Sequence, residues 1–102
     1  ISAVGDDLLP AAVALDQNVP NPFNPMTDIK FSLPQASRVE LRVYDVRGAL
    51  VRNLISGEME AGRHTQVWMG RDDQGQDVPS GVYFYRLQLD REVLTRRMTL
   101  LK

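Results

Sequence analysis

Residues 81–89 read Gly-Val-Tyr-Phe-Tyr-Arg-Leu-Gln-Leu and carry the clearest strand pattern in the chain. In an extended conformation, one face of this stretch would present four apolar or aromatic side chains: Tyr83, Tyr85, Leu87 and Leu89. Alternation with a period of two is typical of a strand that buries one face. No window of the chain shows a convincing helical period. The stretch therefore predicts an all-β protein.

The same alternation recurs on both sides of residues 81–89. We expect further strands at residues 28–33, 38–43, 50–55, 65–68 and 93–101. Turn signals separate them, with Pro34 ending one strand and Gly57 following another. About seven strands with turns roughly every 8–12 residues predict a two-sheet antiparallel β-sandwich.

The chain has one domain preceded by a short linker. Residues 1–14 are acidic and irregular, and we interpret them as the linker, with residues 15–102 as the domain. Three prolines between residues 15 and 25 exclude a helix or a central strand there, because proline lacks a backbone donor. That stretch is expected to be an extended lead-in or an edge strand, with Phe23 anchored in the core.

Composition and net charge argue against several classes of function. Hydrophobic residues make up 43% of the 102 residues, and the formal net charge is -1. This charge favours neither nucleic acid nor an anionic membrane. The absence of cysteine and the single histidine argue against a zinc site, and no apolar run is long enough to span a bilayer. No signal peptide is visible, and the start at Ile1 leads us to expect a piece of a longer protein.

The residues give little indication of catalysis. His64 is the only histidine, and no nucleophile motif lies near it. We expect its ring to hydrogen-bond the backbone at the start of a strand, and we expect no enzyme activity and no cofactor. Ser80, between Pro79 and Gly81, does not form a nucleophile elbow.

An acidic loop is the one candidate metal site. Asp72, Asp73 and Asp77 are candidate calcium ligands, because calcium favours clustered oxygen atoms in flexible loops. Their spacing does not match the helix-loop-helix calcium loop. A solvated turn that carries all three carboxylates without a metal is the alternative.

Two further surfaces each allow more than one interpretation. Residues 83–86 could stack on single-stranded nucleic acid, but alternation sends neighbouring rings to opposite faces, and nucleic acid is not expected. Exposed tyrosines here keep a carbohydrate-binding role open. From Arg91 to Lys102 there are four basic residues and one acid, Glu92. This end is either a recognition strand for an acidic partner or an edge strand protected by charge.

Five motifs in order suggest a known family. They are Val19 to Pro25; Tyr44 and Asp45 with Gly48; Ala61 and Gly62 with His64; Ser80 to Tyr85; and Arg97 to Lys102. With them the chain, from Leu15 to Lys102, resembles the type A C-terminal sorting domains of the type IX secretion system of Bacteroidota. It is also similar to the Ig-like domain of the flagellar hook-capping protein. Met69 departs from the family pattern, which has Asp there.

The resemblance implies an Ig-like antiparallel β-sandwich of about seven strands that is a non-catalytic secretion signal. It implies passage through the periplasm, recognition by outer-membrane secretion machinery, an upstream cargo domain in the same chain, and a secreted or cell-surface destination. The recognition residues would be Arg96, Arg97, Met98, Leu100, Leu101 and Lys102. A terminal edge strand can pair with a partner strand through backbone hydrogen bonds. A structural Ig-like spacer and a carbohydrate-binding accessory module are the rival interpretations.

Overall fold

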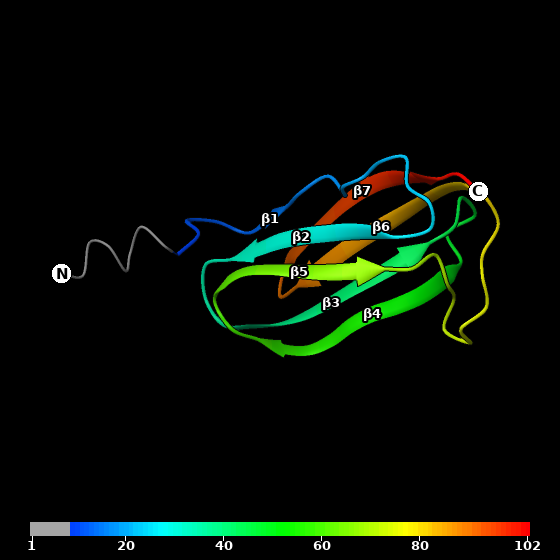
Figure 1. Ribbon diagram of the computed structural model, residues 1–102. Coiled ribbons are helices and arrows are strands. Elements are labelled where there is room, and N and C mark those ends of the chain that lie inside the picture. The colour runs from blue at the N-terminus through cyan, green and yellow to red at the C-terminus, as the bar shows by residue number, and fades with distance from the viewer. Residues whose placement is uncertain (1–8) are drawn as a thin grey trace.

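Seven strands form in the part of the chain that the computed structural model describes, residues 9–102 (Figure 1). They are β1 (Ala14–Leu15), β2 (Thr27–Leu33), β3 (Ser37–Tyr44), β4 (Leu50–Met59), β5 (Gly62–Trp68), β6 (Gly81–Leu89) and β7 (Glu92–Leu100). These described residues contain no helix. The all-β prediction is confirmed.

The strands build two antiparallel sheets that pack face to face, which confirms the predicted sandwich. The smaller sheet has the order β1-β2-β5 and the larger has the order β4-β3-β6-β7. The chain passes from one sheet to the other after β2, β4 and β5. The turn after β3, the long loop before β6 and the C-terminus therefore lie together at one end of the sandwich (Figure 1).

Some strand boundaries differ from those expected. β4 continues to Met59, and Gly57 lies inside it, opposite Val39 of β3, instead of ending the strand. Cross-strand pairing outweighs the weak strand preference of glycine at this position. β1 begins at Ala14, the last residue of the predicted linker. Residues 1–8 of that linker lie outside the described part of the chain.

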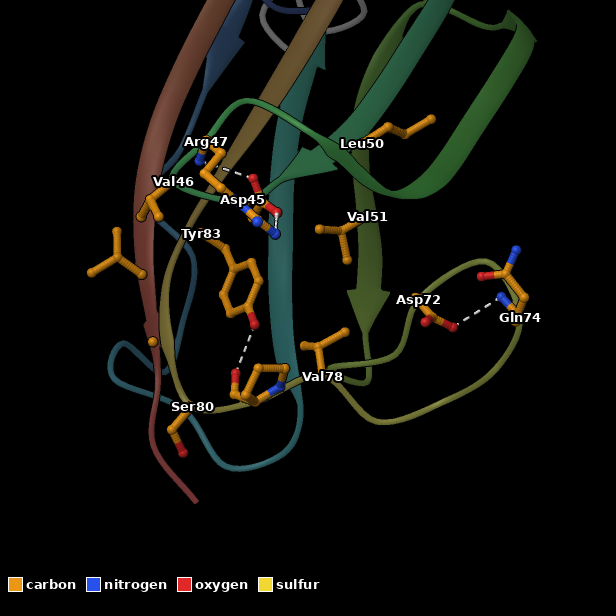
Figure 2. A pocket seen from close by; sticks show the side chains of 13 residues that line it. Asp45, Val46, Arg47, Leu50, Val51, Asp72, Gln74, Val78, Ser80 and Tyr83 are labelled. Carbon is orange, nitrogen blue, oxygen red and sulfur yellow. Dashed lines mark hydrogen bonds and ion pairs between the residues drawn. The ribbon is translucent and has the colours of Figure 1, made fainter.

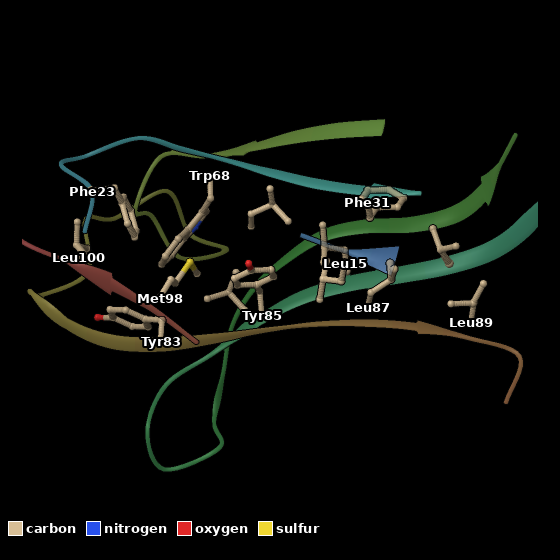
Figure 3. Packing of buried hydrophobic residues seen from close by; sticks show 14 of the residues in the cluster. Leu15, Phe23, Phe31, Trp68, Tyr83, Tyr85, Leu87, Leu89, Met98 and Leu100 are labelled. Carbon is tan, nitrogen blue, oxygen red and sulfur yellow. The ribbon is translucent and has the colours of Figure 1, made fainter. Parts of the chain in front are cut away.

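The core lies between the two sheets and is richest in aromatic rings at one end (Figure 3). The predicted inward face of β6 is confirmed, because all four of its side chains are buried: Tyr83, Tyr85, Leu87 and Leu89. Trp68 is 1% exposed. Its ring lies 5.7 Å from that of Phe23 and 5.4 Å from that of Tyr83, so Phe23 is anchored in the core as expected.

We predict that Trp68→Ala lowers the free energy of unfolding by about 3–5 kcal/mol, because it removes the largest core side chain and leaves a cavity. The variant also frees the carbonyl of Arg71, which accepts a hydrogen bond from Trp68 Nε1 at 2.9 Å. Urea unfolding followed by circular dichroism measures the change. The exposed neighbour variant Val67→Thr serves as the control and should stay within about 0.5 kcal/mol of the parent. Equal stability of Trp68→Ala and the parent would contradict this account of the core.

Candidate functional site

A segment outside the main strands covers one edge of the larger sheet. This covering segment, residues 16–25, runs from β1 along β7 before the chain enters β2 (Figure 1). It is pinned by Asn18, which is buried and whose side chain donates to the carbonyl of Pro20 and to the hydroxyl of Thr27. The hydroxyl of Tyr85 accepts from the amide of Asn18 and donates to the carbonyl of Asp16. Residues from both sheets thus hold the segment in place.

The covering segment occupies backbone groups of β7 that we expected to be free. The amide of Phe23 donates to the carbonyl of Thr99 at 3.0 Å, and the amide of Leu101 donates to the carbonyl of Phe23 at 3.0 Å. The amide of Thr99 donates to Asn21 Oδ1 at 3.0 Å. The expectation of an open terminal edge is therefore corrected: a partner strand would have to displace the covering segment before pairing here.

The expected recognition residues divide between the core and the surface. Met98 and Leu100 are 0% exposed, because alternation along β7 turns them toward the smaller sheet. They cannot contact a partner while the domain is folded, and we correct that expectation for both. Arg96, Arg97, Leu101 and Lys102 are exposed and share the surface at this end of the chain.

The exposed residues differ in what they contact. Arg96 donates from Nε to the carbonyl of Leu15 and so closes the gap between β7 and β1. The backbone amide of Lys102 donates to Ser80 Oγ at 2.9 Å, which fixes the last residue against the loop before β6. No ion pair of residues 9–102 includes the side chain of Arg96, Arg97 or Lys102. These cations are available to an external anion.

The acidic loop does not assemble a metal site. Asp72 Oδ1 accepts from the amides of Gln74 and Gln76, whereas Asp73 Oδ1 accepts from the amide of Asn53. Asp77 Oδ1 lies 3.2 Å from Arg71 Nε. Each candidate calcium ligand has its own protein partner. Across residues 9–102, no three His, Cys, Asp or Glu side chains are grouped closely enough to hold a metal ion.

Asp72 belongs to a five-residue turn that occurs twice within residues 9–102. In residues 72–76, as in residues 45–49, the first carboxylate accepts from the third and fifth amides, and the glycine amide donates to the first carbonyl. Gly48 and Gly75 have φ values of 84° and 81°, which glycine adopts without strain. A hydrogen bond from the amide of Ala49 holds the pKa of Asp45 below its ordinary value. The Asp-x-x-Gly spacing that both turns share is the signal in the sequence from which this repetition could have been found.

A hollow of about 430 Å³ opens between these two turns (Figure 2). Apolar side chains such as Val51 and Val78 line it together with Tyr83, whose hydroxyl donates to the carbonyl of Pro79 at 2.7 Å. Burial raises the pKa of Tyr83, and the nearby charge of Asp45 adds to this effect. The lining includes no histidine or lysine that would serve as a base for Ser80.

His64 has the structural role expected for it. Its Nε2 donates to the carbonyl of Glu60 at 2.7 Å, and its ring stacks on Phe31 with 5.2 Å between centroids. Tyr83 and Tyr85 are buried, so the exposed tyrosines on which a carbohydrate-binding role depended are not present on β6. Within residues 9–102 there is no helix long and apolar enough to cross a membrane.

The two packed antiparallel sheets of residues 9–102 define a class, the Ig-like β-sandwich modules. The FlgD Ig-like domain family matches residues 24–92, and the chain belongs to this family. The basal-body rod modification protein FlgD of Salmonella typhimurium is 42% identical over 48 residues. That alignment covers 47% of this chain but only 21% of the relative. The FlgD of Salmonella typhi matches equally well.

Solved structures show the same fold as part of larger proteins. Dimeric latent PorU from Porphyromonas gingivalis superposes on 87% of this chain with a TM-score of 0.68 at 18% identity, over 9% of its own length. FlgD from P. aeruginosa superposes on 90% of this chain and 73% of its own, with a TM-score of 0.59 at 25% identity. PorZ of Porphyromonas gingivalis superposes on 88% of this chain and 11% of its own, with a TM-score of 0.53 at 22% identity. The Ig-like relation expected from the motifs is confirmed.

We predict that the charge of Asp45 stabilises the domain at pH values above 3.8, the ordinary pKa of this carboxyl group. The reason is that the folded state lowers the pKa of Asp45. The parent should be more stable than Asp45→Asn at neutral pH. This advantage should disappear as the pH falls through the lowered pKa, where the parent also becomes neutral at this position. Thermal unfolding of both proteins between about pH 7 and about pH 2 measures the difference. A difference that stays constant across this range would show that the charge is not involved.

We predict that Asn21→Ala speeds hydrogen exchange at the amide of Thr99, because the variant removes the acceptor of that amide. A change of about three- to tenfold corresponds to one hydrogen bond of about 1 kcal/mol. Amides in the central strand β3 serve as the internal reference and should keep their rates. Unchanged exchange at Thr99 would mean that the covering segment does not protect β7 in solution.

Proposed function

We propose that residues 15–102 are a non-catalytic C-terminal sorting domain, which directs a cargo protein through the outer-membrane type IX translocon to the cell surface. The observation that carries the proposal is the arrangement of the last residues. Arg97, Leu101 and Lys102 form an exposed basic and apolar tip, while the intervening Met98 and Leu100 lock the tip to the core. A folded domain thereby displays its terminus in a fixed position.

The motif order supports this proposal, and one structural neighbour is consistent with it. PorZ is described as an essential bacterial surface component of the type IX secretion system. Its likeness to this chain concerns the fold alone, so the terminal tip and the motifs carry more weight. Under this proposal the partners are outer-membrane secretion machinery and an upstream cargo domain in the same chain. The parent protein would be secreted or held on the surface of a bacterium of the Bacteroidota after crossing the periplasm.

A structural spacer is the second candidate, and membership of the FlgD Ig-like domain family favours it. A spacer needs the sandwich, with a core that resists unfolding, but it needs no particular chemistry at its terminus. The two candidates therefore differ in what substitutions at the exposed tip would do. Both are compatible with a domain that has no catalytic role and no cofactor.

We predict that fusing residues 9–102 to the C-terminus of a periplasmically directed reporter moves the reporter to the surface or medium of a type IX-competent bacterium. Deleting the tip would be a poor test, because residues 97–102 include the core side chains of Met98 and Leu100. The double substitution Leu101→Ser and Lys102→Glu changes only exposed side chains. It should lower export by about tenfold or more if the tip is recognised.

The matched control is Lys30→Glu, which reverses one exposed charge on the smaller sheet. It should leave export unchanged, and melting temperatures should show that all variants are folded. A parent fusion that stays in the periplasm would overturn the sorting proposal. Export that is insensitive to the tip substitutions would remove the role assigned to residues 101 and 102.

A further inference from the structure

The outer face of the larger sheet carries aromatic and basic side chains in register. Two cross-strand rows run over β3, β6 and β7: Tyr44, Phe84 and Arg97 in one, and Arg42, Arg86 and Thr95 in the other. These side chains point away from the core, because the alternate positions, such as Val43 and Tyr85, are buried between the sheets. On this face Thr95 and Arg97 are exposed, whereas the side chains nearer the middle of the sheet are half-buried: Tyr44, Arg42, Phe84 and Arg86.

Arg86 is held in a defined position on this face. Its guanidinium carbon lies 4.6 Å from the centre of the Tyr44 ring, and one of its terminal nitrogens donates to the Tyr44 hydroxyl. A stacked guanidinium loses less conformational freedom when it binds a carboxylate than a free one does. A shallow hollow of about 260 Å³ lies beside the stack and is lined by Phe84 and Thr95 among others. The site thus combines a fixed cation with an apolar contact surface.

No acidic side chain of residues 9–102 forms an ion pair with the two arginines on the outer face of β6 and β7. Arg86 and Arg97 take part in no ion pair of residues 9–102. Asp45 also lines the hollow, but two backbone amides and Arg47 satisfy its carboxylate. Arg42 is paired with Glu40 at 3.3 Å. The half of the face over β6 and β7 is therefore positive, although the chain has a net charge of -1.

The spacing of the two unpaired cations matches an extended peptide. Arg97 lies opposite Phe84 and Arg86 lies opposite Thr95, so the two arginines are diagonal neighbours. The Cβ atoms of such neighbours are about 7–8 Å apart. In an extended chain, side chains two residues apart lie on one side and are separated by about 6.6–6.8 Å. Two carboxylates in the pattern acidic-x-acidic therefore have the spacing of the Arg86 and Arg97 Cβ atoms. The guanidinium of Arg86 is held over the Tyr44 ring of β3, and the long, unpaired side chain of Arg97 sets the position of the second guanidinium.

We propose that this outer face of β6 and β7 binds an extended acidic segment of a partner protein, with carboxylates two residues apart on Arg86 and Arg97. Phe84 supplies the apolar contact between them. A bilayer or a polyanionic glycan fits less well, because the neighbouring outward positions of β6 and β7, Gln88 and Val93, are uncharged and Arg42 on β3 is paired with Glu40. The inference does not depend on the export role, since it concerns binding by the purified domain.

The test uses the whole chain and a set of labelled peptides, each of about twelve residues, with two glutamates on a Ser/Val background that favours an extended conformation. The separation between the glutamates is varied from about one to about four residues around the spacing expected for a strand. Fluorescence polarisation should show the tightest binding for a separation of two. Replacing both glutamates with glutamine, or raising the salt concentration from about 0.05 to about 0.5 M, should weaken binding several-fold.

The double substitution Arg86→Glu and Arg97→Glu should weaken binding of the best peptide by about tenfold or more. Arg97→Glu alone leaves the stack of Arg86 on Tyr44 in place and should still weaken binding several-fold. The matched control, Lys30→Glu with Arg91→Glu, makes the same change in net charge at exposed sites elsewhere and should bind as the parent does. No binding, no preference for a separation of two, equal loss in the control, or tighter binding to heparin or anionic vesicles than to the best peptide would overturn the proposal.

Discussion

The hydroxyl group of Tyr85 ties the larger sheet to the segment that covers its edge. Its ring belongs to the core side of β6, while its oxygen accepts from the amide of Asn18 and donates to the carbonyl of Asp16. Without this pair of bonds, the covering segment would be held against β7 by Phe23, by Asn21 and by Gln17, whose side chain donates to the carbonyl of Arg97. A buried polar group is costly when it lacks partners, so the register of the segment is tied to the position of one phenol. The ordinary pKa of a tyrosine, 10.0, already leaves the phenol protonated and able to donate at neutral pH, and burial raises the pKa of Tyr85 further.

The last strand divides its side chains between the core and the surface. Met98 and Leu100 complete the aromatic end of the core, and the residues between and after them face outward. A terminal motif therefore need not be recognised at every position, because alternation assigns half of it to packing. The charged side chains are also unevenly placed. The chain is nearly neutral, yet cations without an ion pair lie on β7 and on the adjacent face of β6. The distribution of charge is more informative here than its sum.

Much of the sandwich could be predicted from the sequence, because strands that bury one face must alternate. The inward residues of β6 and the anchoring of Phe23 follow from that constraint and from the core they form. Gly57 shows the limit of prediction from local sequence. It pairs with Val39 of β3, and the residues around Gly57 do not reveal this pairing. The position of the covering segment could not be predicted from the sequence either, because the hydrogen bonds of Asn18 and Asn21 join residues far apart in the chain. For the candidate site, the sequence identified the basic residues of the last strand, but without the register it could not distinguish their exposed positions from the buried positions of Met98 and Leu100.

The covering segment has a consequence for where this domain can be cut. The family match begins at residue 24, inside a β-sandwich whose β7 edge is covered by the residues just before that point. A fragment that began at residue 24 and ran to Lys102 would lose Leu15, Asn18 and Phe23 and leave part of a strand edge unpaired. Unpaired edges template the addition of further chains, so such a fragment would be prone to aggregate even though every strand of the larger sheet is retained. The residues that pack into the sandwich thus begin upstream of the family match, at β1.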